Sequence, residues 1–260
     1  MTKIIINDED FSVSYTNGIS PMSIKVESHM HTGYEILLIV KGKVSYCIDG
    51  FRFSVKPYDL LFIPVNTYHF LIPEDNSEYE NYVINIKEDF FDKSRLDKVF
   101  VPPYKINISD DSLMRGLFDN LHSYYQVCSR EDFILAAKNT VEQLIVFASY
   151  KPREAEVNDK SIAGRISQYI IENITEPLDA GIIAQKFNFA GTYIQNLFSK
   201  EMGIGLKHYI NKKKIYAARF DICGGMSPLE AADKYGYKNY SSFYRQYVKE
   251  FGVSPQKSKR

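Results

Sequence analysis

The sequence has few cysteines and no long apolar stretch, and these two absences exclude several classes of protein. Cys47, Cys128 and Cys223 are widely separated and have neither the spacing of a metal motif nor that of a disulfide framework. No segment approaches the roughly twenty apolar residues that span a bilayer, and the apolar run at residues 4–6 is too short for a signal peptide. The sequence therefore predicts a reduced, cytoplasmic protein without a membrane partner.

The chain has no net charge, but its positive and negative residues are unevenly distributed along the sequence. Residues 160–260 contain 16 Lys and Arg against 8 Asp and Glu, a net charge of +8. Residues 1–159 contain 16 against 24, a net charge of −8. A basic half favours a polyanionic partner, because phosphate neutralisation supplies much of the affinity for nucleic acid.

The basic half contains one pattern twice, over residues 184–203 and 232–252. Each copy has an alanine, a turn residue four positions later, a pair of aromatic or aliphatic positions, and a Lys-Glu-x-Gly ending. The matching alanines, Ala184 and Ala232, are 48 positions apart. Such a repeat indicates one supersecondary unit used twice.

The parts of each copy predict a helix-turn-helix. Asp179 is a suitable N-cap for a first helix, and Asn188 and Gly236 accept the positive φ of a sharp turn. A second helix with a polar outer face follows and ends at Gly203 or Gly252. A long helix, roughly residues 206–222, joins the copies. The alternative is a helical packing or dimerisation module, since single helix pairs are common.

Residues 1 to about 105 have the pattern of a β-barrel or sandwich, with short strands, frequent turns and no intervening helices. Asp49-Gly50 is a strong hairpin signal. The expected strands are Ser23–His31, Glu35–Tyr46, Phe51–Val55, Leu60–Pro64 and Asn81–Ile86.

Two amphipathic helices are expected at residues 109–127 and 130–149, as a pair that packs on the β-domain or on a second chain. Residues 151–159 are polar and aperiodic, as in a linker. The expected domains are 1–105, 106–150, the linker 151–159, and 160–260. The apolar stripes are Leu113, Leu117, Leu121 and Tyr124/Tyr125 on one helix, and Phe133, Ala137, Val141, Leu144 and Ala148 on the other.

The C-terminal hundred residues resemble the DNA-binding domain of the AraC/XylS family of bacterial transcription regulators. The N-terminal part resembles the cupin-like sensor domain that often precedes it. The resemblance implies an α+β multidomain fold, with a cupin-like β-barrel and helical pair followed by an all-α domain with two helix-turn-helix motifs. It rests on Ala231-Ala232-x3-Gly236-Tyr237-x5-Phe243-x3-Tyr247-x4-Gly252-Val253-Ser254-Pro255 and on the first copy with Gly203 and Tyr209-Ile210-Asn211.

By position, the resemblance implies which residues contact DNA. Gln and Asn suit adenine edges and Arg suits guanine, whereas Lys200 and Lys249 suit phosphates. The implied contacts are Thr192, Gln195, Asn196 and Lys200 in the first copy, and Tyr240, Ser241, Tyr244, Arg245 and Lys249 in the second.

Five positions depart from the family pattern. Ala190 replaces the usual Ser cap of the first recognition helix, which weakens its start by around 1 kcal/mol. Gly181 is a poor helix former. Lys214 stands in place of Arg, Asp221 at an apolar position, and Val248 in place of Lys.

The N-terminal part contains a set of histidines with the spacing of the cupin metal motif. His29, His31, Glu35 and His69 would form a site of three imidazoles and one carboxylate. Asn66 replaces the motif's second glycine and Ser23 its first, so we expect no metal and no cofactor. We expect the four side chains instead to contact a small polar effector at the barrel mouth. The alternative is that they pair with one another. Tyr34, Tyr46, Tyr58 and Tyr68 suit sugar stacking and core packing equally.

The sequence thus predicts a transcription regulator rather than an enzyme. Its expected partners are double-stranded promoter DNA, a small polar effector such as a sugar, a second copy of the chain, and RNA polymerase. The alternative is a metal-dependent cupin enzyme, such as a dioxygenase or isomerase, fused to a DNA-binding domain.

Overall fold

The computed structural model of the chain describes residues 2–8, 11–19, 28–87, 90–102, 104–152 and 161–258. The chain forms an N-terminal unit of residues 1–48 and 52–159 and a C-terminal unit of residues 160–260, with which residues 49–51 are grouped. Each unit is described by itself. The predicted linker falls largely on residues outside the described ranges.

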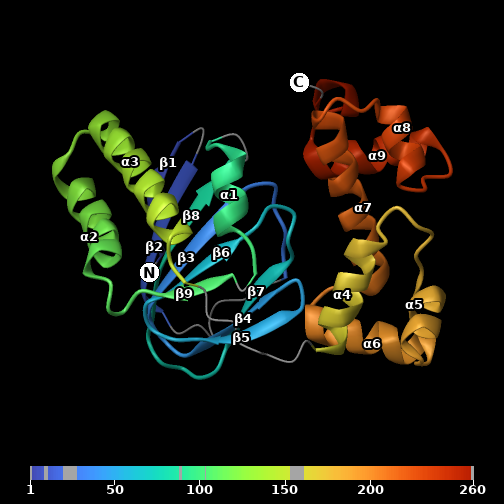
Figure 1. Cartoon of the computed structure of the whole chain (residues 1–260), viewed down its shortest axis with the longest axis horizontal. Coiled ribbons are helices and arrows are strands. Elements are labelled where there is room, and N and C mark those ends of the chain that lie inside the picture. Colours follow the sequence, from blue (N-terminus) through green and yellow to red (C-terminus); the bar gives the residue numbers. More distant parts are fainter. Residues whose placement is uncertain are drawn as a thin grey trace. The chain divides into compact units, whose positions relative to one another are not determined.

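The N-terminal unit contains two antiparallel sheets (Figure 1). The larger one has the order β1-β2-β8-β3-β6-β9 and the smaller one the order β5-β4-β7. The described strands therefore form an open arrangement of two sheets rather than one closed barrel. The bounds are Thr2–Asn7 (β1), Phe11–Ile19 (β2), Tyr34–Lys41 (β3), Val44–Ile48 (β4), Phe51–Val55 (β5), Asp59–Ile63 (β6), His69–Pro73 (β7), Tyr79–Ile86 (β8) and Lys105–Asn107 (β9).

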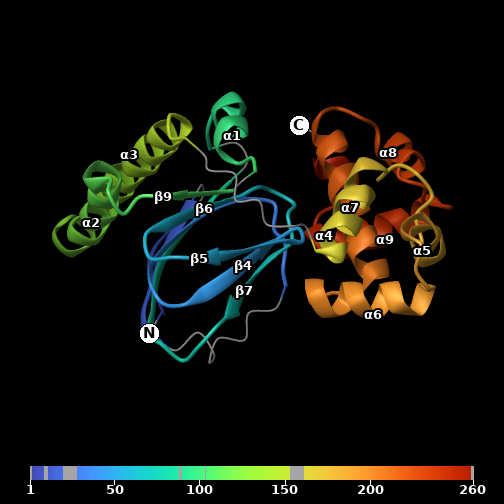
Figure 2. The same cartoon turned by 60° about the horizontal axis from the view of Figure 1, so that its bottom comes forward.

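Helices cover the face of the larger sheet that lies away from the smaller sheet (Figures 1 and 2). They are α1 (Lys93–Val99), α2 (Ser112–Val127) and α3 (Arg130–Ser149). Ile36 and Leu38 of β3 belong to the core shared with these helices. Leu37 and Ile39, on the other face of the same strand, are equally buried. A strand buried on both faces has a continuous apolar sequence, as β3 does.

The hairpin and most helical predictions are confirmed. Phe51–Val55 is a strand, and the Asp49-Gly50 turn before it has positive φ at both residues. All five apolar residues predicted for the second helix of the pair are buried. In the first helix Leu117 and Leu121 are buried, but Leu113 is 57% exposed. The prediction for Leu113 is wrong because Met114 and Phe118 complete the buried face of α2 instead.

Several strand predictions needed correction. The expected strand Glu35–Tyr46 is two strands, because Gly42 turns the chain with a φ of +122°. Helix α1 interrupts the region expected to be β only. It begins where the Asp92 side chain accepts a hydrogen bond from the Ser94 amide. Most of the expected strand Ser23–His31 lies outside the described residues, although His29 forms an isolated bridge with His69. Strands β1, β2, β7 and β9 were not predicted.

The C-terminal unit is helical, and the predicted long helix is confirmed as α7. Two short helix pairs, α5 with α6 and α8 with α9, stand on either side of α7 in the sequence, and a 3-10 turn at Pro255–Ser258 ends the described chain. The bounds are Ile162–Glu172 (α4), Ala180–Phe187 (α5), Gly191–Met202 (α6), Leu206–Cys223 (α7), Pro228–Lys234 (α8) and Tyr240–Phe251 (α9).

Candidate DNA interface and effector site

The first helix pair has the turn and caps that its sequence predicts. The Asp179 side chain accepts a hydrogen bond from the Ile182 amide at 2.9 Å and begins α5. Asn188 adopts the left-handed conformation with a φ of +59° and turns the chain toward α6. Gly203 closes α6 in the same conformation, with a φ of +67°. The caps and the turn set the angle between the two helices, which together form a helix-turn-helix.

The two faces of α6 differ in character. Ile194, Phe198 and Met202 are fully buried. The opposite face is exposed, and it carries the four residues expected to contact DNA: Thr192, Gln195, Asn196 and Lys200.

The second pair is built in the same way. Ser227 and Glu230 form a reciprocal capping box at the start of α8, and Gly236 turns the chain with a φ of +74°. On α9, Phe243 and Tyr247 are fully buried. The remaining expected contacts, Ser241, Tyr244, Arg245 and Lys249, are exposed, and Tyr240 is half-buried.

Hydrogen bonds position two of these side chains. The Tyr240 hydroxyl accepts a hydrogen bond from the side-chain amide of Gln256 (Nε2) at 2.7 Å, which ties the start of α9 to the C-terminal 3-10 turn. The Nε of Arg245 donates to the Ser241 carbonyl at 3.4 Å, one helical turn earlier. Arg245 is therefore held along the exposed face of α9.

The two recognition helices begin differently. Asn239 caps α9 by accepting a hydrogen bond from the Ser242 amide at 2.8 Å. Ala190 occupies the N-cap position of α6 and provides no side-chain hydrogen bond. The first recognition helix therefore lacks the side-chain cap that the second one has, and its weaker start remains a prediction.

Two other departures from the family pattern have local explanations. Asp221 accepts hydrogen bonds from Lys234 at 2.7 Å and from Tyr235 at 2.8 Å, so it joins α7 to α8. A Cβ at Gly181 would lie 3.2 Å from the capping Oδ1 of Asp179. The glycine therefore leaves room for the cap of α5.

Sequence reasoning did not predict a groove of about 680 Å³ between the two helix pairs. Three lysines line it: Lys207, Lys214 and Lys238. Lys207 and Lys238 are exposed, whereas Lys214 donates to the Glu176 carbonyl at 2.9 Å, and burial lowers its pKa. The only signal in the sequence was the basic excess of this half, because the lysines are far apart along the chain.

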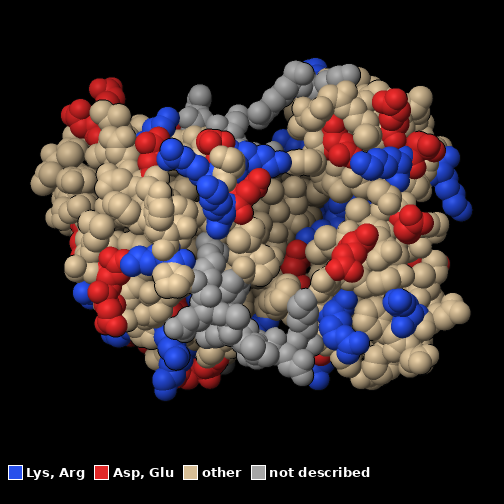
Figure 3. All heavy atoms as spheres, in the orientation of Figure 1, with Lys and Arg blue, Asp and Glu red and all other residues tan. Residues whose placement is uncertain are grey.

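The basic excess is not segregated on every surface of the C-terminal unit. On the face seen in Figure 3, Lys and Arg side chains lie among Asp and Glu side chains. Sequence-independent attraction to DNA therefore depends on which face carries α6, α9 and the lysine groove.

In the N-terminal unit, backbone hydrogen bonds hold the segment 28–33 against the start of β7. The amides of His29 and His69 donate to each other's carbonyls at 3.2 and 3.0 Å, and the Asn66 amide donates to the His31 carbonyl at 2.9 Å. Glu35 projects from the second residue of β3. The four residues expected to contact an effector are thereby brought together, with all their ligand atoms within 4.8 Å of one another.

We call His29, His31, Glu35 and His69 the histidine cluster. Oε2 of Glu35 is 3.3 Å from Nε2 of His31 and 3.7 Å from Nε2 of His69. Burial alone would raise the pKa of Glu35, but hydrogen bonding and charge attraction from the two imidazoles hold it well below its usual range. Burial lowers the pKa of His31, but its bond to Glu35 outweighs this and raises it overall. Glu35 is therefore a buried and negatively charged carboxylate.

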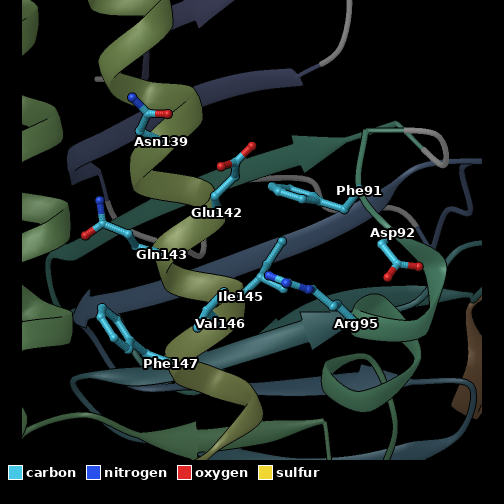
Figure 4. Close-up of a pocket in the computed structure, with 9 residues that line it drawn as sticks. All are labelled: Phe91, Asp92, Arg95, Asn139, Glu142, Gln143, Ile145, Val146 and Phe147. Carbon is cyan, nitrogen blue, oxygen red and sulfur yellow. The ribbon is translucent and has the colours of Figure 1, made fainter.

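Two cavities of the N-terminal unit bear on ligand access. One of about 320 Å³ is lined by residues of β2 and β8 and by His31, so it reaches the histidine cluster. Another of about 540 Å³ lies between α1 and α3, where Phe91 and Arg95 point toward α3 (Figure 4). Glu142 and Gln143 of α3 line that second cavity, and no member of the histidine cluster does.

Within the described residues, no helix combines the length and apolar character needed to cross a bilayer.

Comparison with known families and proteins assigns a type to both units. Residues 20–144 match the AraC-like ligand binding domain, and residues 183–260 match a helix-turn-helix domain. The chain is 24% identical over 249 residues to the HTH-type transcriptional regulator YfiF of Bacillus subtilis strain 168, covering 87% of this chain and 76% of YfiF. It is 28% identical over 102 residues to YtdP of the same organism, covering 39% of this chain but only 13% of YtdP.

Among solved structures, ToxT from Vibrio cholerae O395 aligns over 96% of this chain and 97% of its own, with 12% identity and a TM-score of 0.39. The two matched domains and the relatives that share them, together with the paired helix-turn-helix motifs, lead to one assignment. The chain belongs to the AraC family of transcription regulators, with a ligand-binding domain followed by a helix-turn-helix DNA-binding domain.

Proposed function

We propose that this regulator binds promoter DNA by placing α6 and α9 in two successive major grooves. The observation that supports this most is the matched design of the two helices. Each buries one face in the C-terminal unit and exposes a polar face with side chains able to hydrogen-bond base edges. In α6 these side chains are Gln195 and Asn196, and in α9 the main one is Arg245.

We assign different roles to the lysines. Lys200 and Lys249 are exposed near the C-terminal ends of α6 and α9 and contact phosphates that flank each groove. Lys207 and Lys238 line the groove between the helix pairs, where the DNA backbone passes from one major groove to the next. Phosphate contacts position the protein without discriminating bases.

The ligand of the N-terminal domain binds, in our proposal, at the histidine cluster. A buried carboxylate with three imidazoles suits a small polar or charged ligand far better than an apolar one. The cavity beside His31 gives that ligand a route to the cluster. We propose a regulatory and not a catalytic role for this domain, in the bacterial cytoplasm where promoter DNA and RNA polymerase are found.

A second copy of the chain is the proposed partner of α2 and α3. These helices share the core of the N-terminal unit on one side, yet Leu113, Val127 and Leu135 are each more than half exposed. Apolar side chains of this size are stabilised by burial against another surface. Analytical ultracentrifugation of wild type and Leu135→Glu tests the dimer: the variant should sediment as a monomer.

The DNA-binding proposal is tested by selecting binding sites from random duplexes with the full-length chain. We expect a defined sequence, and an affinity that falls steeply with salt. Lys207→Ala and Lys238→Ala should each reduce the salt slope by about 1. Lys56→Ala, an exposed lysine of the N-terminal unit, is the control and should leave the slope unchanged. Failure to enrich any sequence would refute the proposal.

A further inference from the structure

The cavity between α1 and α3 of the N-terminal unit has the size and the surface of a binding site for a small molecule. Its volume is about 540 Å³, and sites for small molecules typically have about 300–1,000 Å³. The apolar side chains that line it are Phe91, Ile145, Val146 and Phe147. Ile145 is buried, and the other three are half-buried. The cavity therefore offers an apolar surface that is partly open to solvent.

Two side chains of opposite charge also line the cavity, one from the α1 side and one from α3. Arg95 extends from α1 toward α3, and Glu142 extends from α3 on the side where Phe91 lies (Figure 4). Within the described parts of the chain, neither Arg95 nor Glu142 forms an ion pair or a side-chain hydrogen bond. A guanidinium has paired N–H donors that fit a carboxylate, and a carboxylate accepts hydrogen bonds from an ammonium group. Both charges are thus available to a ligand.

The other carboxylate that lines the cavity is already engaged in its own helix. Oδ1 of Asp92 accepts a hydrogen bond from the Ser94 amide at 3.0 Å, and Oδ2 accepts one from the Ser94 hydroxyl at 2.8 Å. These bonds hold the Asp92 carboxylate at the first turn of α1. Asn139 and Gln143 of α3 contribute neutral amide groups to the lining. Arg95 and Glu142 are therefore the charged groups through which the cavity can select a ligand.

We propose that this cavity binds a free α-amino acid with a large apolar side chain. Arg95 binds the carboxylate of the ligand, and Glu142 binds its ammonium group. The side chain of the ligand packs against Phe91, Val146 and Phe147. A zwitterion is preferred because a simple anion would leave the glutamate unpaired and a simple cation would leave the arginine unpaired. This site is additional to the one proposed at the histidine cluster, and the two share no residue.

Isothermal titration calorimetry of the full-length protein with L-phenylalanine and L-leucine tests the proposal. We expect one molecule of amino acid to bind per chain. Two analogues of phenylalanine each lack one charge, since phenylpropanoate has no ammonium group and phenylethylamine has no carboxylate. Wild type should bind each analogue at least about tenfold more weakly than phenylalanine, as expected for the loss of a hydrogen bond to a charged group.

Substitutions in the cavity should remove these preferences one at a time. Arg95→Gln should abolish the preference for phenylalanine over phenylethylamine, and Glu142→Gln the preference over phenylpropanoate. Both side chains are exposed, so both variants should fold, and circular dichroism checks this. Lys98→Gln and Glu131→Gln are the matched controls, because they remove exposed charges of α1 and α3 that do not line the cavity. Both controls should keep wild-type affinity.

Three results would overturn the proposal. The first is wild-type protein that binds neither amino acid. The second is that Arg95→Gln and Glu142→Gln both keep the wild-type preferences. The third is that His69→Ala loses binding of phenylalanine while both cavity variants bind normally, which would place the amino acid at the histidine cluster. We expect His69→Ala to bind phenylalanine with wild-type affinity.

Discussion

Asn188 and Gly236 adopt the same left-handed backbone conformation at the turns of the two helix-turn-helix motifs, with φ of +59° and +74°. One motif uses a residue that tolerates this conformation and the other a residue that has no steric cost there. The orientation of each recognition helix depends on this single backbone position. Substitutions at the two positions should therefore have different consequences.

Gly236→Ala should lower the free energy of unfolding by about 1–2 kcal/mol, because a Cβ is strained at positive φ. Its surroundings would accept the extra atom, since the nearest contact is the Lys214 ammonium at 3.6 Å. Gly116→Ala is the matched control, because Gly116 lies within α2 with nothing near its Cβ position. It should stabilise the protein by roughly 0.5–1 kcal/mol. Urea unfolding measures both, and equal effects would show that backbone strain is not the cause.

Ala190→Ser should stabilise α6 by around 1 kcal/mol, since its hydroxyl can accept the hydrogen bond that α6 lacks at its start. Asn239→Ala should destabilise α9 by a similar amount, because Asn239 makes that bond at present. Chemical denaturation of the two variants gives both values. No gain from Ala190→Ser would mean that another group satisfies the first turn of α6.

These caps and turns were predictable from sequence because they depend on contacts within a few residues. The strand break at Gly42 was not, since the sequence does not show that this glycine adopts a positive φ instead of continuing the strand. Leu113 was assigned to the core because it fits an i, i+4 stripe. Tertiary packing decides which of two overlapping stripes faces the sheet. In α2 the buried stripe includes Met114 and Phe118 and not Leu113.

The histidine cluster was predicted in part from the sequence. Its members were identified by residue type and spacing, which sequence retains. Their orientation depends on carbonyls of Gly33 and Thr67 and on the bridge between His29 and His69. None of these has a sequence pattern. The lysine groove was missed for the same reason, because Lys207 of α7 and Lys238 of the turn between α8 and α9 line one groove only through tertiary packing.

His69→Ala should alter the response of DNA binding to the bound ligand without abolishing DNA binding. The residue belongs to the N-terminal unit, whereas all proposed base contacts belong to the C-terminal unit. Affinity for the selected duplex, with and without ligand, measures the response. If His69→Ala instead removes metal together with a measurable catalytic turnover, the enzyme interpretation is correct.

Arg245 and Lys249 should affect binding in different ways. Arg245→Ala should lose about 1–3 kcal/mol of discrimination at one base pair, as for an arginine that contacts guanine. Lys249→Ala should weaken all sequences to a similar degree, as expected for a phosphate contact. A scan of single-base variants of the selected site gives the comparison. Swapped outcomes would mean that α9 lies in the groove in another register.

A footprint of the full-length chain on its selected duplex tests the central claim most directly. The 18 residues of α7 span about 27 Å at 1.5 Å each. Together with the lateral offset of the helix pairs, we therefore expect the two recognition helices to be separated by nearly one DNA turn of ~34 Å. Each chain should protect two patches about one turn apart on one side of the duplex, with Gln195→Ala altering one and Arg245→Ala the other. A single patch per chain, insensitive to Gln195→Ala, would contradict the account.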